Sequence, residues 1–240
     1  MIREAIILAG GLGTRLRSVT GNLPKCMVRL GGKPFLEYLL QYLCTHDFGH
    51  VVLSVGYRHE PIYEHFGDSF RGMKLDYAVE KEPLGTGGGI RLSLQSCRQD
   101  EVFILNGDTL FSLAPAVLEE FHHRMHSPLT LSLRYVDDTS RYGKVIIRDG
   151  RITGFISKNS RGKGFINAGV YLVRKAFISG LPLPAKFSFE KDLLEQVIGK
   201  EKVYGMVSDA YFIDIGIPED YNRALVELPV LFLQGDTDRD

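Results

Sequence analysis

The first half of the chain alternates short apolar runs with amphipathic stretches. Apolar runs cover residues 5–9, 50–55 and 101–105, and each ends at glycine or polar residues. Pro34 precedes leucines that recur at helical spacing, namely Leu36, Leu39, Leu40 and Leu43. Short apolar runs are typical of buried strands, whereas a period of three to four residues predicts a helix. The pattern predicts an α/β fold with a mostly parallel central sheet and helices on both faces.

The second half predicts more strands and fewer helices. A further strand at 75–79 and helices at 86–96 and 114–125 complete the first half. After them we expect these strands: 129–136, 143–148, 151–157, 165–173 and one near Val203. Asp149-Gly150 is typical of a tight hairpin turn. Helices at 189–198 and 218–228 complete the expected elements.

Length and composition favour one domain. We expect residues 1–240 to form a single domain, with a first half of about 1–128, a β-rich second half of about 129–228, and a tail at 229–240. Ligands of such sheets gather at the carboxyl ends of the strands. The glycine turn after residues 5–9 and the sequence Asn106-Gly107-Asp108 both follow such ends. We therefore expect them to share one site.

Charge and cysteine usage narrow the class of protein. Lys plus Arg and Asp plus Glu each number 29, so no chain-wide surface for nucleic acid is expected. The three cysteines form no paired spacing, which fits a reducing compartment. With no signal-like start and no apolar run of about 18 residues, we expect a cytoplasmic protein without a membrane span. The apolar sequence at 230–233 favours packing on the body or a homodimer.

The stretch "LAGGLGTRL", residues 8–16, predicts an anion-binding turn. The dinucleotide fingerprint lacks its third glycine here because Leu16 stands in that place, and no P-loop sequence occurs in the chain. What remains is a glycine turn with backbone N–H groups and Arg15, which can contact phosphate oxygens in pairs. A purely structural glycine turn is the alternative.

Further motifs give the chain its resemblance to a known family. They are "LPKCMV" at 23–28, "GKPFLEY" at 32–38, "EPLGTGG" at 82–88, "LNGDT" at 105–109, "FISK" at 155–158, "INAGVY" at 166–171 and "IDIGIPEDY" at 213–221. Together with the glycine turn, and in this order, they resemble the sugar-1-phosphate nucleotidyltransferases. The family often has Glu-Lys-Pro where this chain has Ser157-Lys158-Asn159, and Gly-Thr-Pro where it has Gly216-Ile217-Pro218.

The resemblance implies a role for each motif. Catalytic residues would be Arg15 on the leaving phosphates, Lys25 near the α-phosphate, and Asp108. Asp108 and Asp214 would bind Mg²⁺. The nucleotide would be bound by Leu8, Ala9, Gly10, Gly11, Gly13, Thr14, Glu82, Gly85, Thr86, Gly87 and Gly107. The sugar phosphate would be bound by Gly143, Lys158, Asn167, Gly169, Glu190 and Lys191.

Several of these residues also have purely structural interpretations. Asp108 can cap a turn, Asn167 can be a satisfied strand amide, and Lys191 can lie on a helix surface. The histidines at 122, 123 and 126 have the spacing of a metal pair, but we expect a solvated helix face. The sequence Asp236-Thr237-Asp238 has glycosyltransferase-like aspartates, but it lies in the tail rather than at a strand end.

The chemistry implied is the attack of a sugar-1-phosphate oxygen on the α-phosphorus of a nucleoside triphosphate. That oxygen is already ionised near neutral pH, so the reaction needs positioning and charge stabilisation rather than a general base. Within the family, "LGTGG" at 84–88 and "FSFEKD" at 187–192 most resemble the D-glycero-D-manno-heptose 1-phosphate guanylyltransferases. This branch implies GTP as partner and GDP-heptose for surface polysaccharide as product.

Other functions remain open at this point. Within the family, the alternatives are mannose 1-phosphate with GTP and an amino-sugar phosphate with UTP. Outside it, the alternatives are a non-catalytic sugar-nucleotide sensor and a retaining glycosyltransferase. A sensor would not need Arg15, Lys25 and both aspartates together, and a glycosyltransferase should carry D-x-D at a strand end.

Overall fold

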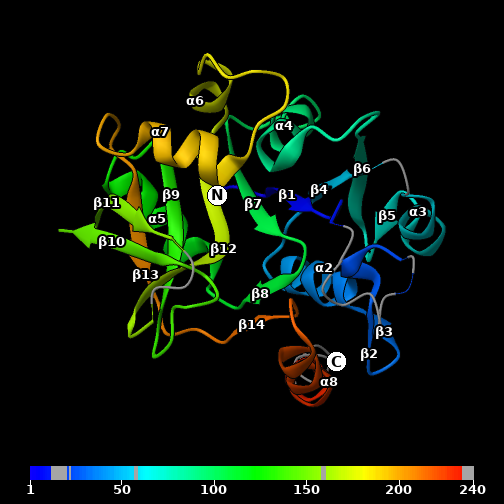
Figure 1. Ribbon diagram of the computed structural model, residues 1–240. Coiled ribbons are helices and arrows are strands. Elements are labelled where there is room, and N and C mark those ends of the chain that lie inside the picture. The colour runs from blue at the N-terminus through cyan, green and yellow to red at the C-terminus, as the bar shows by residue number, and fades with distance from the viewer. Residues whose placement is uncertain (12–20, 22, 57–58, 158–160, 234–240) are drawn as a thin grey trace.

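A twisted mixed sheet forms the centre of the molecule (Figure 1). The computed structural model describes residues 1–11, 21, 23–56, 59–157 and 161–233. Within these residues the large sheet has ten strands, in the order β10 (Lys144–Arg148), β11 (Arg151–Ile156), β13 (Tyr204–Val207), β9 (Leu129–Val136), β12 (Gly164–Arg174), β7 (Glu101–Asn106), β1 (Glu4–Leu8), β4 (His50–Val55), β6 (Met73–Val79) and β5 (Ser69–Phe70).

Strand pairing divides the sheet into two regions. Strands β7, β1, β4 and β6 are parallel, so that Ile6 of β1 lies beside Val52 on one side and Ile104 on the other. In the second half, β12 is antiparallel to both β7 and β9, and β10 forms a hairpin with β11. The α/β fold is therefore confirmed, with its parallel part in the first half and hairpins in the second, as the apolar pattern predicted.

Helices cover both faces of the sheet. One face carries α2 (Phe35–Thr45), α3 (Glu60–Phe66), α5 (Pro115–Arg124) and α8 (Pro218–Leu233). The other carries α4 (Gly85–Ser93), α6 (Lys175–Ser179), the π-helical η3 (Phe189–Leu194) and α7 (Glu195–Val197). Successive β1 residues serve both cores, because Ile6 packs with the second set and Ile7 with the first. Figure 1 shows α4, α6 and α7 above the sheet and α2 and α8 below it.

Two small ribbons, each of two strands, accompany the large sheet. Strand β14 (Phe212–Asp214) pairs with β8 (Thr109–Phe111), and β2 (Arg29–Leu30) pairs with β3 (Lys33–Pro34). The short 3₁₀ turn η2 (Lys25–Met27) precedes β2. The β14–β8 ribbon matters most, since it joins two segments that both carry a candidate metal ligand.

The last helix is longer than the sequence pattern predicted. We expected it to end at 228, but α8 continues through Pro229 to Leu233. Gly31 has a φ of +57°, and a Cβ there would lie 2.7 Å from the Pro229 ring, so this glycine leaves room for the proline. Beyond it, the Phe232 ring packs edge-on against Tyr38 with centroids 5.3 Å apart. Tertiary packing thus holds the first five residues of the expected tail.

The helix expected at 189–198 begins as a π-helix. Residues 189–194 form the wider turn, and only 195–197 are α-helical. Ser188 caps the start, because its Oγ accepts from the Lys191 N–H at 3.2 Å and its own N–H donates to Asp192 Oδ2 at 2.6 Å. π-helical turns are rare and often lie at functional sites. No helix among residues 1–233 that the structure describes is long and apolar enough to cross a membrane.

Candidate active site

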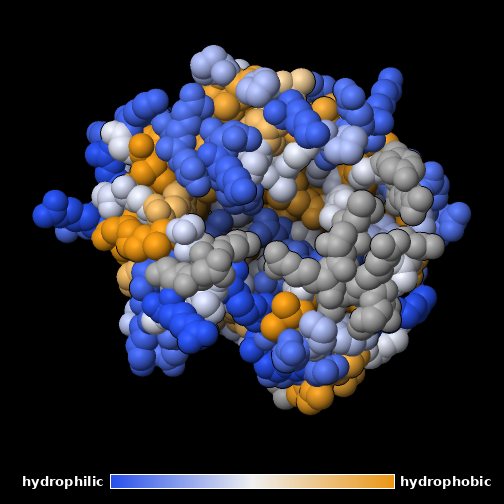
Figure 2. Space-filling model, in the orientation of Figure 1, coloured by the Kyte–Doolittle hydropathy of each residue, from blue (hydrophilic) through white to orange (hydrophobic). Residues whose placement is uncertain are grey.

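The carboxyl ends of the parallel strands open into a cavity of about 500 Å³. Its lining includes the ends of β1, β4 and β7 and the residues that follow them, namely Leu8 to Gly11, Ser54 to Gly56 and Asn106 to Asp108. The rest of the wall includes Glu80, Glu82, Pro83, Gly85, Thr86 and Glu190. Figure 2 shows hydrophilic residues around a hollow near the middle of this face. This size is in the range of small-molecule sites.

Gly107 allows the two central strand ends to approach each other. Its N–H donates to the Leu8 carbonyl at 3.1 Å, and a Cβ on it would lie 2.3 Å from that same oxygen. Any side chain at 107 would therefore force β1 and β7 apart. Because Asp108 follows directly, this contact also fixes where its carboxylate lies.

Lys25 and two aspartates form the charged part of the site. Lys25 Nζ lies 2.5 Å from Asp108 Oδ2 and 3.8 Å from Asp214 Oδ1. The β14–β8 ribbon brings the aspartates together, with Asp214 paired to Thr109 and the Ile215 N–H donating to the Asp108 carbonyl at 3.0 Å. The sequence prediction that these three residues act together is consistent with this geometry.

Two carboxylates this close repel each other. Burial of Asp214, together with the Asp108 carboxylate, raises the pKa of Asp214 above its usual range. Lys25, the Gly216 N–H at 2.7 Å and the Arg141 guanidinium oppose that shift only in part. The pair of carboxylates therefore suits a cation, and its oxygen donors are of the kind that Mg²⁺ prefers.

Arg141 holds the far side of Asp214. Its guanidinium is paired with Asp220, in the first turn of α8, and lies 3.8 Å from Asp214 Oδ2. The same guanidinium stacks over the Tyr142 ring at 5.0 Å. Arg141 is not among the predicted site residues, so this contact between the second half and the aspartates was missed.

The glycines at the start of α4 serve two purposes. Gly85 and Thr86, which lie in the loop predicted to bind the nucleotide (the nucleotide loop), line the cavity. Gly87 instead faces the Phe187 ring, where a Cβ would lie 2.1 Å from a ring carbon, and its N–H donates to the Phe187 carbonyl at 3.0 Å. Gly87 therefore acts through packing in this structure rather than through the cavity wall.

Sequence reasoning missed one carboxylate of the cavity, that of Glu80. Its Oε2 accepts from the Leu84 N–H at 2.8 Å, which fixes the carboxylate at the end of β6 beside Glu82. The signal was present in the sequence, since Glu80 follows the apolar residues of a strand. Two acidic side chains from this segment thus line the same cavity as Lys25.

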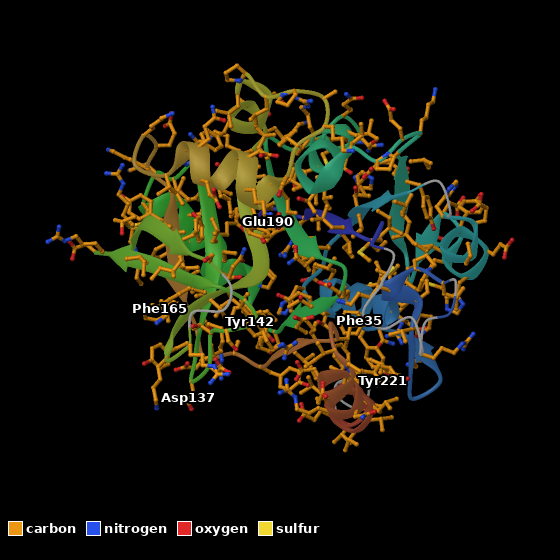
Figure 3. All side chains as sticks on the ribbon, viewed as in Figure 1. Phe35, Asp137, Tyr142, Phe165, Glu190 and Tyr221 are labelled. Carbon is orange, nitrogen blue, oxygen red and sulfur yellow. The ribbon has the colours of Figure 1, made fainter. Side chains whose placement is uncertain are left out.

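The residues predicted for the sugar phosphate fall into two groups. Glu190 lines the cavity, and Figure 3 shows it near the middle of this face, between the two halves. Asn167 and Gly169 shape a bulge in β12: Asn167 Oδ1 accepts from the Gly169 N–H at 3.1 Å, and its Nδ2 donates to the buried Tyr171 hydroxyl at 2.7 Å. Gly169 has a φ of +78° and packs against Asn106 at the end of β7.

Two further residues predicted for the sugar phosphate, and one histidine, are not among the residues that line the cavity. Gly143 has a φ of +80°, and its N–H donates to the Thr139 carbonyl at 3.0 Å within a loop. Lys191 is exposed on η3, which agrees with its helix-surface interpretation. The expectation for His122 was wrong: it is fully buried, and its Nδ1 lies 2.8 Å from Thr130 Oγ1 of β9. Burial lowers the pKa of His122 to about 4.

Four predicted site residues lie outside the described residues: Gly13, Thr14, Arg15 and Lys158. The same holds for the Asp236-Thr237-Asp238 sequence. The described site comprises the β1 turn up to Gly11, Lys25, the two aspartates, and the acidic side chains of Glu80, Glu82 and Glu190.

Comparison with known proteins agrees with this geometry. The nucleotidyl transferase family matches residues 4–229, and the chain belongs to this family. A D-glycero-alpha-D-manno-heptose 1-phosphate guanylyltransferase from Aneurinibacillus thermoaerophilus is 47% identical over 225 residues, which cover 94% of this chain and 98% of that protein. A mannose-1-phosphate guanylyltransferase from Mycobacterium tuberculosis is 35% identical and is covered over 64% of its length.

A solved structure shares the fold over almost its entire length. HddC from Yersinia pseudotuberculosis, complexed with GMP-PN, superposes with a TM-score of 0.84 at 39% identity, and the match covers 93% of this chain and 98% of that one. The predicted family resemblance is therefore confirmed.

Proposed function

We propose that the chain transfers a guanylyl group from GTP to D-glycero-D-manno-heptose 1-phosphate, giving GDP-heptose and pyrophosphate. One observation carries this proposal. The 47% identity with the heptose 1-phosphate guanylyltransferase of Aneurinibacillus thermoaerophilus extends over nearly the full length of both chains. The mannose-1-phosphate relative is less similar and is longer than this chain.

The arrangement of charges supports nucleotidyl transfer. A phosphate oxygen of the sugar 1-phosphate attacks the α-phosphorus, a new P–O bond forms there, and the bond to the leaving pyrophosphate breaks. Two anions must be held in line while negative charge builds on the leaving group. Lys25 lies where the strand ends converge, so its ammonium would stabilise charge at the α-phosphate. Arg15 and Lys158 would contact the leaving phosphates and the sugar phosphate, by family resemblance.

A divalent cation fits the carboxylates. Asp108 and Asp214 would hold Mg²⁺, which commonly binds one or two carboxylates and completes its shell with phosphate oxygens and waters. Such an ion supplies charge neutralisation and orientation of phosphate oxygens. Burial of Asp214 and the nearby Asp108 carboxylate both raise the pKa of Asp214, and a bound cation would relieve both effects.

The acidic wall supports guanine as the base. The Watson–Crick edge of guanine presents two neighbouring N–H donors, whereas uracil presents one N–H between two carbonyls. A carboxylate accepts two such bonds side by side. Glu80 and Glu82 both line the cavity, and Glu80 is already oriented by the Leu84 N–H. The wall is therefore complementary to the two N–H donors of guanine and unfavourable for the two carbonyl groups that flank the single N–H of uracil or thymine.

A measurement of pyrophosphate release tests the proposal. GTP, UTP, CTP, ATP and dTTP are each paired with heptose, mannose, glucose and N-acetylglucosamine 1-phosphates in the presence of Mg²⁺. We expect strong release with GTP and the heptose phosphate, loss with a chelator, and recovery when Mg²⁺ is restored. Strong release with another pair would keep the reaction and replace the substrate. No release with nucleotide binding intact would favour the sensor.

A further inference from the structure

The nucleotide loop and the start of η3 are joined by hydrogen bonds across the cavity wall. The Phe187 N–H donates to the Leu84 carbonyl at 3.0 Å, and the N–H groups of Gly87 and Gly88 return to the Phe187 carbonyl at 3.0 and 3.3 Å. Arg91 adds a clamp, with its guanidinium on the Leu183 carbonyl at 3.0 Å and over the Phe187 ring at 5.0 Å. Residues 84–91 and 183–189 are therefore held together by backbone and side-chain contacts.

Hydrogen bonds of side chains continue this connection into the cavity. Thr86 Oγ1 accepts from the Phe189 N–H at 2.9 Å and donates to Glu190 Oε2 at 3.0 Å. Since the Phe189 N–H already supplies one proton to Oγ1, the hydroxyl proton of Thr86 is directed to Glu190. Ser188 Oγ, at 3.3 Å, also donates to Oε2. Both hydroxyls hold the same oxygen of the carboxylate.

The second oxygen of Glu190 is left for a ligand. Among residues 1–233 that the structure describes, no hydrogen bond reaches Glu190 Oε1. Thr86 and Glu190 line the same cavity as Lys25 and Asp108, and Figure 3 shows Glu190 near the middle of this face. The π-helical turn that begins at Phe189 places Glu190 there. An oriented carboxylate with a free oxygen accepts hydrogen bonds from hydroxyl groups.

We propose that Thr86 is a positioning residue that holds Glu190 for a hydroxyl of the sugar 1-phosphate, so that the nucleotide loop and the recognition of the sugar are coupled. This rests on the proposed function, because the ligand is its sugar phosphate. A carboxylate repels the phosphate of that ligand and attracts its hydroxyls. Glu190 and Lys25 therefore orient the sugar 1-phosphate, because its hydroxyls are attracted to Glu190 on η3 and its phosphate is attracted to Lys25.

Substitution of Thr86 separates this role from a nucleotide contact. Thr86→Val keeps the shape and removes the hydroxyl, so we expect the KM for the sugar 1-phosphate to rise about tenfold, the loss typical of one hydrogen bond to a charged group. The Kd for GTP alone should change less than about twofold. Thr86→Ser should recover most of the sugar KM. Thr153→Val on β11, whose exposed hydroxyl faces the Ile146 carbonyl at 3.3 Å, controls for the substitution itself.

A double-mutant cycle tests the coupling. Glu190→Gln should also raise the sugar KM, and Thr86→Val combined with Glu190→Gln should be no worse than Glu190→Gln alone, because both act through one contact. Additive effects, an effect of Thr86→Val on GTP affinity alone, or equal losses in Thr86→Val and Thr86→Ser would each overturn the proposal.

Failure of the proposed function gives a different result. If the wild-type protein accepts another nucleotide and sugar phosphate, the cycle is run with that pair and the same non-additivity is expected. If no pair reacts, calorimetric binding of the sugar phosphates to the GTP-bound protein replaces KM, and the absence of any such binding overturns the coupling.

Discussion

Lys25 and Asp108 are 83 positions apart in the sequence, yet Lys25 Nζ lies 2.5 Å from Asp108 Oδ2. The contact joins the turn after β1 to the end of β7, and the Lys25 N–H strengthens it by donating to the Gly11 carbonyl at 3.0 Å. With Asp214 at 3.8 Å on the other side, one ammonium faces two carboxylates. The charges needed for phosphoryl chemistry are thus positioned by the fold.

Removal of the Lys25 ammonium should slow the reaction with little change in folding. We expect Lys25→Ala to lower kcat about 100-fold or more, because one preorganised positive group is lost from the reacting phosphates. Initial rates of pyrophosphate release measure this. The control is Lys33→Ala, since Lys33 is more exposed and pairs with Glu37 at 3.4 Å on a helix. A Lys25→Ala enzyme within threefold of wild type would disprove the assignment.

The charged Asp214 side chain should lower the stability of the folded protein. Its pKa is raised by burial and by Asp108, so the charged form destabilises the folded state at neutral pH. We expect Asp214→Asn to raise the midpoint of thermal unfolding at pH 7 by a few degrees while activity is lost. As the pH falls through the raised pKa of Asp214, the wild-type carboxyl becomes protonated and this advantage should shrink.

Calorimetric scans of both proteins from pH 4 to pH 7 measure the difference. Asp209→Asn is the matched control, because that carboxylate is 92% exposed and pairs with Arg134 at 3.5 Å. An Asp214→Asn protein that is less stable than wild type at pH 7 would contradict the prediction.

The opposite pH dependence is expected of Glu4, at the other end of the sheet. Burial alone would raise the pKa of Glu4, but hydrogen bonds from the Gln99 and Arg98 N–H groups and from His50 lower it. The ionised carboxylate therefore stabilises the folded state when the pH is above the ordinary pKa of a glutamate. This contribution is lost as the pH falls below that value and through the lowered pKa of Glu4 in the folded protein. Glu4→Gln should cost about 1–3 kcal/mol of unfolding free energy at pH 7, since it weakens several charged hydrogen bonds.

Urea unfolding of Glu4→Gln and wild type at pH 7 and at pH 3.5 measures this contribution. The two proteins should become more alike in acid. Glu64→Gln, on the exposed side of α3, should be neutral at both pH values. A constant difference between Glu4→Gln and wild type at both pH values would contradict the role of ionised Glu4.

Gly107 should not tolerate a methyl group. Its Cβ would lie 2.3 Å from the Leu8 carbonyl oxygen and 3.2 Å from the Ala9 Cα, and backbone atoms of a central strand cannot give way easily. We expect Gly107→Ala to cost about 1–3 kcal/mol and to lower kcat by displacing Asp108. Gly154→Ala, with nothing within 4 Å of its Cβ position, should be silent. Thermal unfolding and pyrophosphate release distinguish the two.

Local pattern was sufficient where the sheet is parallel and buried on both faces. The apolar runs at 5–9, 50–55 and 101–105 correspond to β1, β4 and β7 within one residue at each end. Their carboxyl ends were the predicted site, and they line the cavity. A strand that is buried on both faces has to be apolar throughout, so its sequence alone predicts that it lies in the centre of the sheet.

Contacts between residues that are far apart in the chain could not be predicted from local sequence pattern. The β14 and β8 strands have only three residues each, and their pairing brings Asp214 beside Asp108. His122 lies in a polar sequence, yet β9 packs over it and Thr130 supplies its partner. Pro229 predicts a helix end on local grounds, but packing against Gly31 lets α8 continue. In each case the deciding neighbour is remote in the chain.

The Phe187 carbonyl also has a consequence for how we expect a nucleotide to be oriented in the cavity. The first N–H groups of a helix form a partial positive charge that attracts anions. In α4, the N–H groups of Gly87 and Gly88 are already occupied by that carbonyl. Two of the first N–H groups of this helix are therefore already paired within the protein, and acidic side chains of the same cavity repel phosphate. We therefore expect a triphosphate to be attracted to Lys25 rather than to this helix, so that charge sets the polarity of the nucleotide before any base is read.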